Sequence, residues 1–399
     1  MLGTDSVDIT PPAGAMMACF PRKAGGKPRI ASGAHDPLQA RAMVFGDGNV
    51  TAAVVSADLT MIRAVDAARI REAVGGSLPE LAGPQCIIAA SHTHHAPETA
   101  YLFGNAPDDP WVRRMDGRIA DAVVRAWAKK RPVSVSMGMG QPGLTHNRRV
   151  VGDDGRSRMV FDHDPAVTTG PTDPDLTAFR FEDADGHATV LFHYAAHALA
   201  AGPKTNVFTA DWPGAARRTV ADGLNGAAVA FLNGAAGDIH PVESMRAGFG
   251  AVERIGRDVG QAVLDALERS QPIDNPALGF ATDRVAFPNR MDPDRKVSVE
   301  LSCLRIGPAV LGTMPGELFC SQGLRFKEAA APNAGLLVGY ANDWLGYLPD
   351  RQAYETGGYG VDAARADPPE RSRTAAPPGA AEACVDRLIS MARCLLDAS

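Results

Sequence analysis

The chain has 399 residues, of which 45% are hydrophobic and 22% are charged, and its formal net charge is −6. The apolar fraction and the moderate charge exclude a disordered chain, and the length fits two to three domains or one large α/β unit. Blocks of Lys or Arg are missing, which argues against a nucleic-acid binder. These features suit a soluble enzyme without identifying its reaction.

The sequence also indicates where the protein is located and in which redox state its cysteines are kept. No uninterrupted apolar segment approaches the ~18 residues of a membrane span, and the N-terminus has neither a basic start nor an apolar run, so no secretory signal is visible. The six cysteines form no CxxC pair and do not resemble a disulfide scaffold. We therefore expect reduced thiols in a cytoplasmic protein without a stable membrane anchor; no pattern specifies an oligomeric state.

The first part of the chain predicts a β-α-β unit. Residues 40–45 and 51–56 flank a Gly-Asp-Gly-Asn turn and are typical of paired strands. Residues 65–74 are typical of a helix, and the apolar run 86–90 of a short buried strand.

Two later apolar runs, 189–192 and 227–232, predict strands that lead directly into segments with histidine. Before them, residues 150–175 are rich in Asp, Gly, Thr and Pro, which indicates a long irregular loop.

The C-terminal part predicts two amphipathic helices. Apolar residues follow the 3.6-residue period over 252–267 and again over 383–396, and residues 364–380 between them indicate a loop rich in Pro and Ala. No repeat or linker divides the chain. We therefore expect one α/β domain over 1–399, with mixed β-sheets flanked by helices.

The strongest local signal is the histidine group that follows strand 86–90. His92 and His94 point to the same side of an extended segment, and His95 follows them. Since neutral imidazole is a common zinc ligand, the pair supplies two ligands, or one ligand and one acid/base group. The alternative is a polar loop whose histidines only satisfy hydrogen bonds.

Two further segments carry histidine after a strand. His193 is typical of a packed core residue, whereas small neighbours around His197 leave room for a ligand. The Gly-rich turn 233–241 carries Asp238 and His240, which suit contacts to a substrate or to ligand side chains. A plain strand-to-helix turn is the alternative.

Three acidic or aromatic signals remain. Glu317, after Pro-Gly, is on its own typical of a helix N-terminal acid, and Asp211 before Pro213 of a helix cap. Tyr347 and Tyr359 belong to a Tyr- and Gly-rich run that either packs as a surface loop or lines a pocket.

In combination these motifs resemble the neutral, non-lysosomal ceramidase family. The similar segments keep the family's order and are 7–12, 39–42, 55–59, the Ser-His-Thr-His run 91–94, 145–148, 233–238, 315–317 and 342–359. The resemblance is strongest over residues 1–360. It implies the fold of that family's catalytic domain, and too few residues follow Tyr359 for the family's separate C-terminal β-sandwich, leaving 361–399 as a loop plus a helix.

The resemblance also implies a site. The family's zinc ligands fall on His92, His197, Glu317 and Tyr347, its catalytic histidine on His94, and its substrate-side arginine on Arg148. The family's serine after the Gly-Asp turn corresponds to His240, and its Ser-Gly after the histidine run corresponds to His95-Ala96. The first change argues against a serine nucleophile and favours metal-activated water.

We therefore expect a zinc-dependent hydrolase that cleaves the C–N amide bond of a small N-acyl substrate. Two His, one Glu and one Tyr suit Zn²⁺. His94 would move a proton, Arg148 would stabilise an oxyanion, and Asp58 and Asp238 are candidates for orienting imidazoles. His240 is a further candidate catalytic residue. An ester, a lactone or a cyclic amide stays open as the substrate, as does a non-catalytic, metal-stabilised binding protein.

Overall fold

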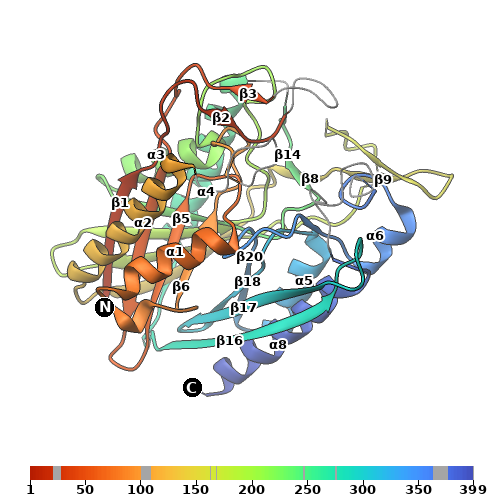
Figure 1. The fold of residues 1–399 in the computed structure, drawn as a ribbon. Helices are drawn as coiled ribbons and strands as arrows, with labels where there is room; N and C mark the ends of the chain where they lie inside the picture. Colours follow the sequence, from red (N-terminus) through yellow and green to blue (C-terminus); the bar gives the residue numbers. More distant parts are fainter. Residues whose placement is uncertain are drawn as a thin grey trace.

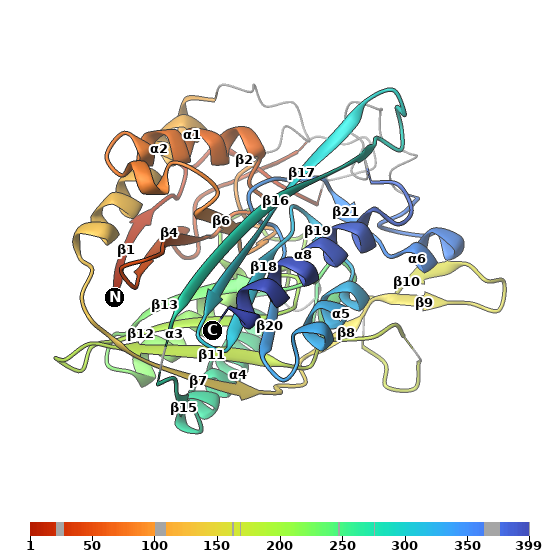
Figure 2. The same ribbon diagram turned by 90° about the horizontal axis from the view of Figure 1, so that it is seen from below.

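The computed structural model describes residues 1–20, 28–99, 109–161, 163–167, 169–245, 248–274, 276–362 and 376–398. Three main β-sheets pack with their inner faces against one another, and helices cover their outer faces (Figures 1 and 2). One buried apolar cluster joins all three sheets and includes Phe45, Ile87, Phe181, Leu232 and Leu311. The expected α/β class with mixed sheets is confirmed.

The first sheet has the strand order β1-β4-β5-β6, and its last two strands are parallel. Helix α1 crosses from β5 to β6, which confirms the predicted β-α-β unit, and α2 packs beside α1 on the same face. The bounds are β1 Leu2–Asp8, β4 Gln39–Gly46, β5 Thr51–Ala57, α1 Ala64–Gly75, a 3-10 turn Pro79–Leu81, β6 Cys86–Ala90 and α2 Pro110–Ala128.

The second sheet has the order β13-β12-β11-β7-β15, with β12 and β13 parallel. Helix α3 connects these two strands, and it packs with α4 over the outer face. The bounds are β7 Ser134–Gly140, β11 Leu176–Glu182, β12 Ala188–Tyr194, α3 Asp211–Gly223, β13 Ala228–Asn233, α4 Gly248–Glu268 and β15 Gln271–Pro272.

The third sheet has the order β16-β17-β18-β20, with β18 and β20 parallel and connected through α5. The C-terminal helix α8 lies across the outer face of this sheet beside α5 (Figure 2). The bounds are β16 Leu278–Pro288, β17 Lys296–Ile306, β18 Ala309–Thr313, α5 Cys320–Ala330, β20 Ala334–Val338 and α8 Ala380–Asp397.

Short strand pairs and one short helix form the loops at one end of the sheets. The pairs are β2 Met16–Met17 with β3 Arg29–Ile30, β8 Thr145–Asn147 with β14 Ile239–Pro241, β9 Arg149–Val151 with β10 Ser157–Met159, and β19 Glu317–Leu318 with β21 Tyr347–Leu348; the helix is α6 Arg351–Thr356.

Each main sheet thus contains one parallel pair of strands, and the sequence motifs follow the carboxyl ends of these pairs. His92 follows β6, His197 follows β12, the Asp238 turn follows β13, and Glu317 follows β18. In α/β folds this is the edge at which ligand sites form. Three sheets therefore direct their loops to one place.

Most predicted elements are confirmed within one to four residues at each end, with two differences. The predicted irregular loop 150–175 contains part of the β9–β10 hairpin. Glu317, which alone resembled a helix N-terminal acid, lies in β19, three residues before α5 begins. Most of the predicted loop 364–380 lies outside the described residues.

In the described part of the chain, no helix combines the length and the apolar character needed to cross a bilayer.

Candidate metal and active site

A cavity of about 230 Å³ lies where the three sets of loops meet. We call it the histidine cavity. His92, His94, Arg148, His240 and Glu317 line one part of it. Apolar and aromatic side chains form most of the rest, among them Phe20, Met61, Phe161, Leu199, Met245 and Trp344.

His92 and His197 are held by backbone carbonyls. The Nδ1 atom of His92 donates to the carbonyl of Thr60 at 2.7 Å, and Nδ1 of His197 donates to the carbonyl of Ala236 at 2.7 Å. A neutral imidazole has one N–H, so these bonds leave both Nε2 atoms as lone-pair acceptors. Each ring is therefore fixed in the tautomer that binds a metal through Nε2.

The two Nε2 atoms face the carboxylate of Glu317. Its Oε2 lies 3.1 Å from Nε2 of His197 and 3.4 Å from Nε2 of His92. Burial, followed by the charge of Arg148, lowers the pKa of His197 to about 4, so this ring is neutral near pH 7. Three buried acceptors that face one another repel unless a cation lies among them. The donor set therefore fits a divalent metal ion.

His94 lies beside this group. Its Nε2 is 3.2 Å from Nε2 of His92, and the donor atoms of His92, His94 and His197 lie within 4.8 Å of one another. Burial lowers the pKa of His94 well below the ordinary value of histidine. Its backbone carbonyl accepts a hydrogen bond from the buried Arg29 at 2.7 Å. A neutral imidazole is thus fixed next to the candidate metal position.

The pairing of β19 with β21 places Tyr347 at the site. It is the parallel partner of Glu317 in the β19–β21 pair, and its hydroxyl accepts a hydrogen bond from Nη2 of Arg148 at 3.1 Å. Burial raises the pKa of the Tyr347 hydroxyl well above its ordinary value. The structure thus brings all four ligand candidates from the sequence around the histidine cavity, and their binding of a metal stays a prediction.

Arg148 is a buried cation with neutral partners. Its guanidinium donates to Nε2 of His240 at 2.9 Å, to the carbonyl of Gly237 and to Tyr347, and it lies against the ring of Tyr359. Among the described residues, no carboxylate lies within ion-pair distance of it. Because a buried charge is costly without a counterion, this arginine is suited to an anionic or oxyanionic group in the cavity.

His240 has a defined role in this geometry. Since an arginine can only donate, Nε2 of His240 must accept, and the ring carries its proton on Nδ1. His240 is the cross-strand partner of His146 in the β8–β14 pair, which also positions Arg148 one residue after β8. The side chain at this position therefore orients Arg148 instead of supplying a hydroxyl nucleophile.

The expectation that Asp58 and Asp238 orient imidazoles is corrected by their contacts. Asp58 accepts hydrogen bonds from Arg217 at 2.7 Å and from the backbone of Gln39. Asp238 accepts from the side chain of Asn147 and from the backbone N–H of Cys320. Backbone carbonyls orient the imidazoles instead, and single-sequence reasoning has no signal for a carbonyl partner.

Tyr340 and Trp344 were not predicted as individual site residues. The ring of Tyr340 stacks on His92 with 4.0 Å between ring centroids, and Trp344 stacks further out at 5.9 Å. Both lie in the Tyr- and Gly-rich run that was interpreted as a possible pocket wall. Both rings pack against His92 and restrict the orientation of its ring.

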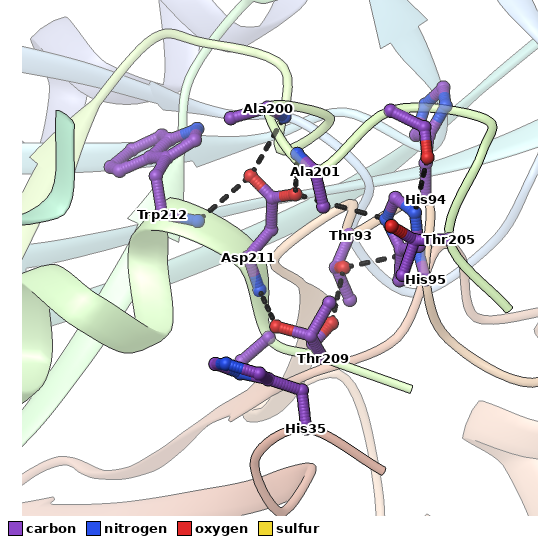
Figure 3. A network of polar contacts seen from close by, with 12 residues as sticks. His35, Thr93, His94, His95, Ala200, Ala201, Thr205, Thr209, Asp211 and Trp212 are labelled. Atoms are coloured by element: carbon purple, nitrogen blue, oxygen red, sulfur yellow. Dashed lines mark hydrogen bonds and ion pairs between the residues drawn. The ribbon is translucent and has the colours of Figure 1, made fainter. Parts of the chain in front are cut away.

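Asp211 connects the two histidine loops (Figure 3). Its carboxylate accepts hydrogen bonds from the backbone N–H groups of Ala200, Ala201 and Trp212 at 2.8–2.9 Å, and its own N–H donates to Thr209. Its Oδ2 lies 3.8 Å from Nδ1 of His95. Asp211 is the first residue of α3, so its side chain fixes the loop after His197 and approaches the loop after His94.

His193 is the packed core residue that was expected. Its Nε2 donates to the carbonyl of Leu337 at 2.9 Å, on the neighbouring sheet. A second group of side chains that could hold a metal ion, Asp183, Asp185 and His187, lies in the β11–β12 turn, where His187 is 75% exposed.

Searches with the sequence match no family model and no curated protein. Comparison with solved structures does find relatives. The neutral ceramidase from Pseudomonas aeruginosa superposes with a TM-score of 0.78 at 16% identity, over 99% of this chain and 74% of that one. A structure described as ceramidase complexed with C2 gives the same TM-score and identity, over 75% of its chain.

This chain has the neutral ceramidase fold. The resemblance seen in the motifs is thereby confirmed at the level of fold, over nearly the whole chain.

Proposed function

We propose that the protein is a metal-dependent hydrolase, with zinc as its metal, that cleaves the C–N amide bond of a small N-acyl substrate. The observation that carries this proposal is the convergence of two Nε2 lone pairs and one carboxylate oxygen beside a cavity that His92 and Glu317 line. The likeness in fold to ceramidases supports the bond type.

His92, His197 and Glu317 would hold the metal, with Tyr347 as a fourth ligand, and this set of nitrogen and oxygen donors suits Zn²⁺. When bound, zinc lowers the pKa of a water ligand to roughly 7 and polarises a carbonyl.

Arg148 binds the carbonyl oxygen of the substrate. Its guanidinium is fixed by His240, Gly237 and Tyr347, so it needs little reorganisation when negative charge develops on that oxygen. A preorganised donor of this kind contributes roughly 2.7–4 kcal/mol to transition-state stabilisation.

His94 transfers a proton from the attacking water to the leaving nitrogen. Its ring lies beside His92 and lines the histidine cavity, and its lowered pKa keeps it in the neutral form, whose ring nitrogen has a lone pair for a proton in transit. Its Nδ1 is buried and has no hydrogen-bond partner in the described part of the chain.

The histidine cavity limits the acyl group. Its volume of about 230 Å³ is below the roughly 300–1,000 Å³ typical of sites for drug-sized ligands. The apolar walls around Met61, Phe161 and Met245 suit a short acyl chain or a small ring. We therefore propose a small N-acyl substrate and not a long-chain lipid.

A panel of N-acetyl, N-butanoyl and N-hexadecanoyl amines, with matched O-acyl esters, tests this function. Release of the carboxylic acid should be fastest for a short-chain amide, stop after treatment with a chelator, and return on addition of zinc. Turnover that survives complete metal removal would contradict the metal-dependent reaction, and faster turnover of the esters would contradict the amide bond. A metal-loaded protein that turns over nothing would favour a binding function.

A further inference from the structure

A second and larger cavity lies away from the histidine cavity. Its volume is about 440 Å³, and it lies between β1 and β4 on one side and α3 and β13 on the other. In Figure 2, β1 and β4 lie close to β13 near the N-terminus. The lining includes Arg41, Lys129, Arg217 and Arg218, so we call it the basic cavity. It shares no lining residue with the histidine cavity.

A buried arginine, Arg217, and a partly exposed one, Arg41, share one carboxylate at this cavity. Asp58 is fully buried and lies 2.7 Å from Nη2 of Arg217 and 3.3 Å from Nη1 of Arg41. Burial, followed by repulsion from Arg217, lowers the pKa of Arg41 to about 10. Asp36 acts on Arg41 from further away. At short range, the two guanidinium groups therefore share the one carboxylate of Asp58.

Arg217 also has unused donors. The side chain is 4% exposed, and its Nε and Nη1 atoms have no hydrogen-bond partner among the described residues. Buried N–H groups of this kind are rare in native proteins unless water or an ion accepts from them. Both atoms are shielded from solvent, but Arg217 lines the basic cavity, so a small shift of its side chain would bring these donors to an acceptor there.

The rim of the cavity repeats the pattern. Asp5 accepts from both Lys129, at 2.6 Å, and Arg125, at 2.7 Å, so a single carboxylate again has two cations. Arg218, on the other rim, pairs with Glu253 on α4. Positive side chains thus outnumber the carboxylates that they contact, both at Asp58 on the floor of the cavity and at Asp5 on the rim facing β1.

The remaining walls offer hydroxyl groups and an apolar surface. Thr4, Ser6 and Thr189 line the cavity together with small residues of β13 such as Ala228 and Ala230. We propose that the basic cavity binds the phosphate monoester group of a small metabolite, with Arg41, Arg217 and Lys129 facing the phosphate and the alanine wall facing the organic part. Guanidinium groups match phosphate oxygens in geometry, and the excess positive charge matches a dianion.

The test uses the full chain and isothermal titration calorimetry with inorganic phosphate, glucose 6-phosphate and AMP at low ionic strength. We expect at least one monoester to bind with one-to-one stoichiometry, with a Kd below about 1 mM and tighter than inorganic phosphate. The absence of monoester binding to the wild-type protein would overturn the proposal, and so would inorganic phosphate binding as tightly as the best monoester.

Variants locate the binding. Arg217→Gln leaves Asp58 with one cation fewer and can impair folding, so the decisive variant is Ala228→Glu, which adds a carboxylate to an exposed wall position without removing a native contact. It should weaken monoester binding at least about tenfold. Ala73→Glu, on the exposed surface of α1 and outside the cavity, is the matched control and should change nothing. Lys129→Ala should weaken binding severalfold.

Equal affinity in Ala228→Glu and wild type would place the ligand elsewhere and overturn the proposal, leaving the ion pairs with a structural role only. Because the two cavities share no lining residue, either result leaves the proposed hydrolase function to its own test.

Discussion

The histidine cavity and the basic cavity differ in which kind of polar group is in excess. In the histidine cavity, the acceptors Nε2 of His92, Nε2 of His197 and Oε2 of Glu317 face one another. In the basic cavity, the N–H donors of Arg41 and Arg217 share the single carboxylate of Asp58. An excess of acceptors fits a cation, and an excess of donors fits an anion. The charge sign of the ligand expected in each cavity thus follows from the polar groups that already face that cavity.

Loss of an acceptor should have the largest effect. His92→Ala removes one Nε2 from the candidate metal position, so we expect bound zinc to be lost from the purified protein and turnover to fall at least about a thousandfold. Elemental analysis and amide hydrolysis measure the two quantities. His187→Ala removes an exposed histidine from the β11–β12 turn and should change neither. Full activity in a metal-free His92→Ala protein would end the metal-dependent interpretation.

A change at Arg148 tests the one arginine that lines the histidine cavity among the described residues. Arg148→Gln should lower kcat about 10²–10³-fold with little change in zinc content, because the oxyanion loses a fixed donor. Arg149→Gln is a demanding control, since the adjacent guanidinium does not line the cavity and donates instead to the carbonyls of Gly357 and Tyr359. Equal losses of kcat in both variants would show that Arg148 has no special position.

A change at Asp58 tests directly whether this carboxylate supports the basic cavity or the histidine cavity. Asp58→Asn leaves Arg41 and Arg217 without a carboxylate, and breaking such a buried pair costs about 3–5 kcal/mol of unfolding free energy. Zinc content should stay unchanged in the folded variant, because the carboxylate contacts arginines and not imidazoles. Denaturant unfolding measures the stability, with the exposed ion-pair variant Asp154→Asn as control. Unchanged stability together with lost zinc would restore the expectation that Asp58 supports a histidine.

A third group of buried charges lies between α1 and α2. We expect a change there to have a smaller effect than a change at either cavity. Burial, followed by the nearby charge of Asp66, raises the pKa of Asp116 to about 7 from an ordinary 3.8. The folded state therefore holds a proton that the unfolded state releases between pH 4 and pH 7, and stability falls as the pH rises through this window. Asp116→Asn should remove this loss and raise Tm at pH 8 by about 1–3 °C, with little change at pH 4. If the Tm values of the variant and the wild type changed in parallel between pH 4 and pH 8, Asp116 would not be the source of this pH dependence.

The sequence predicts the local parts of this picture well. The alternation and length of the apolar runs identify β5, β6, β12 and β13, and the motif order identifies the fold through its resemblance to ceramidases. The candidate ligands follow from the same resemblance. What it does not predict are contacts between distant segments, such as the carbonyl of Thr60 that orients His92, or the arginines that take Asp58 away from the imidazoles.

The reason is physical. A histidine in a sequence has no visible tautomer until its second ring nitrogen has a partner, and a carboxylate has no visible role until its nearest cation is known. Both depend on tertiary contacts between strands of different sheets, here separated by more than a hundred residues for His197 and Glu317. The basic cavity likewise arises where β13 and α3 pack against β1 and β4, and no single motif marks it.

The most direct test of the central claim is an anomalous difference map at the zinc edge, from crystals grown with one equivalent of zinc. We predict one dominant peak in the histidine cavity, about 2 Å from Nε2 of His92, Nε2 of His197 and a carboxylate oxygen of Glu317. A map with no peak there, or with its only strong peak at Asp183, Asp185 and His187, would contradict the account.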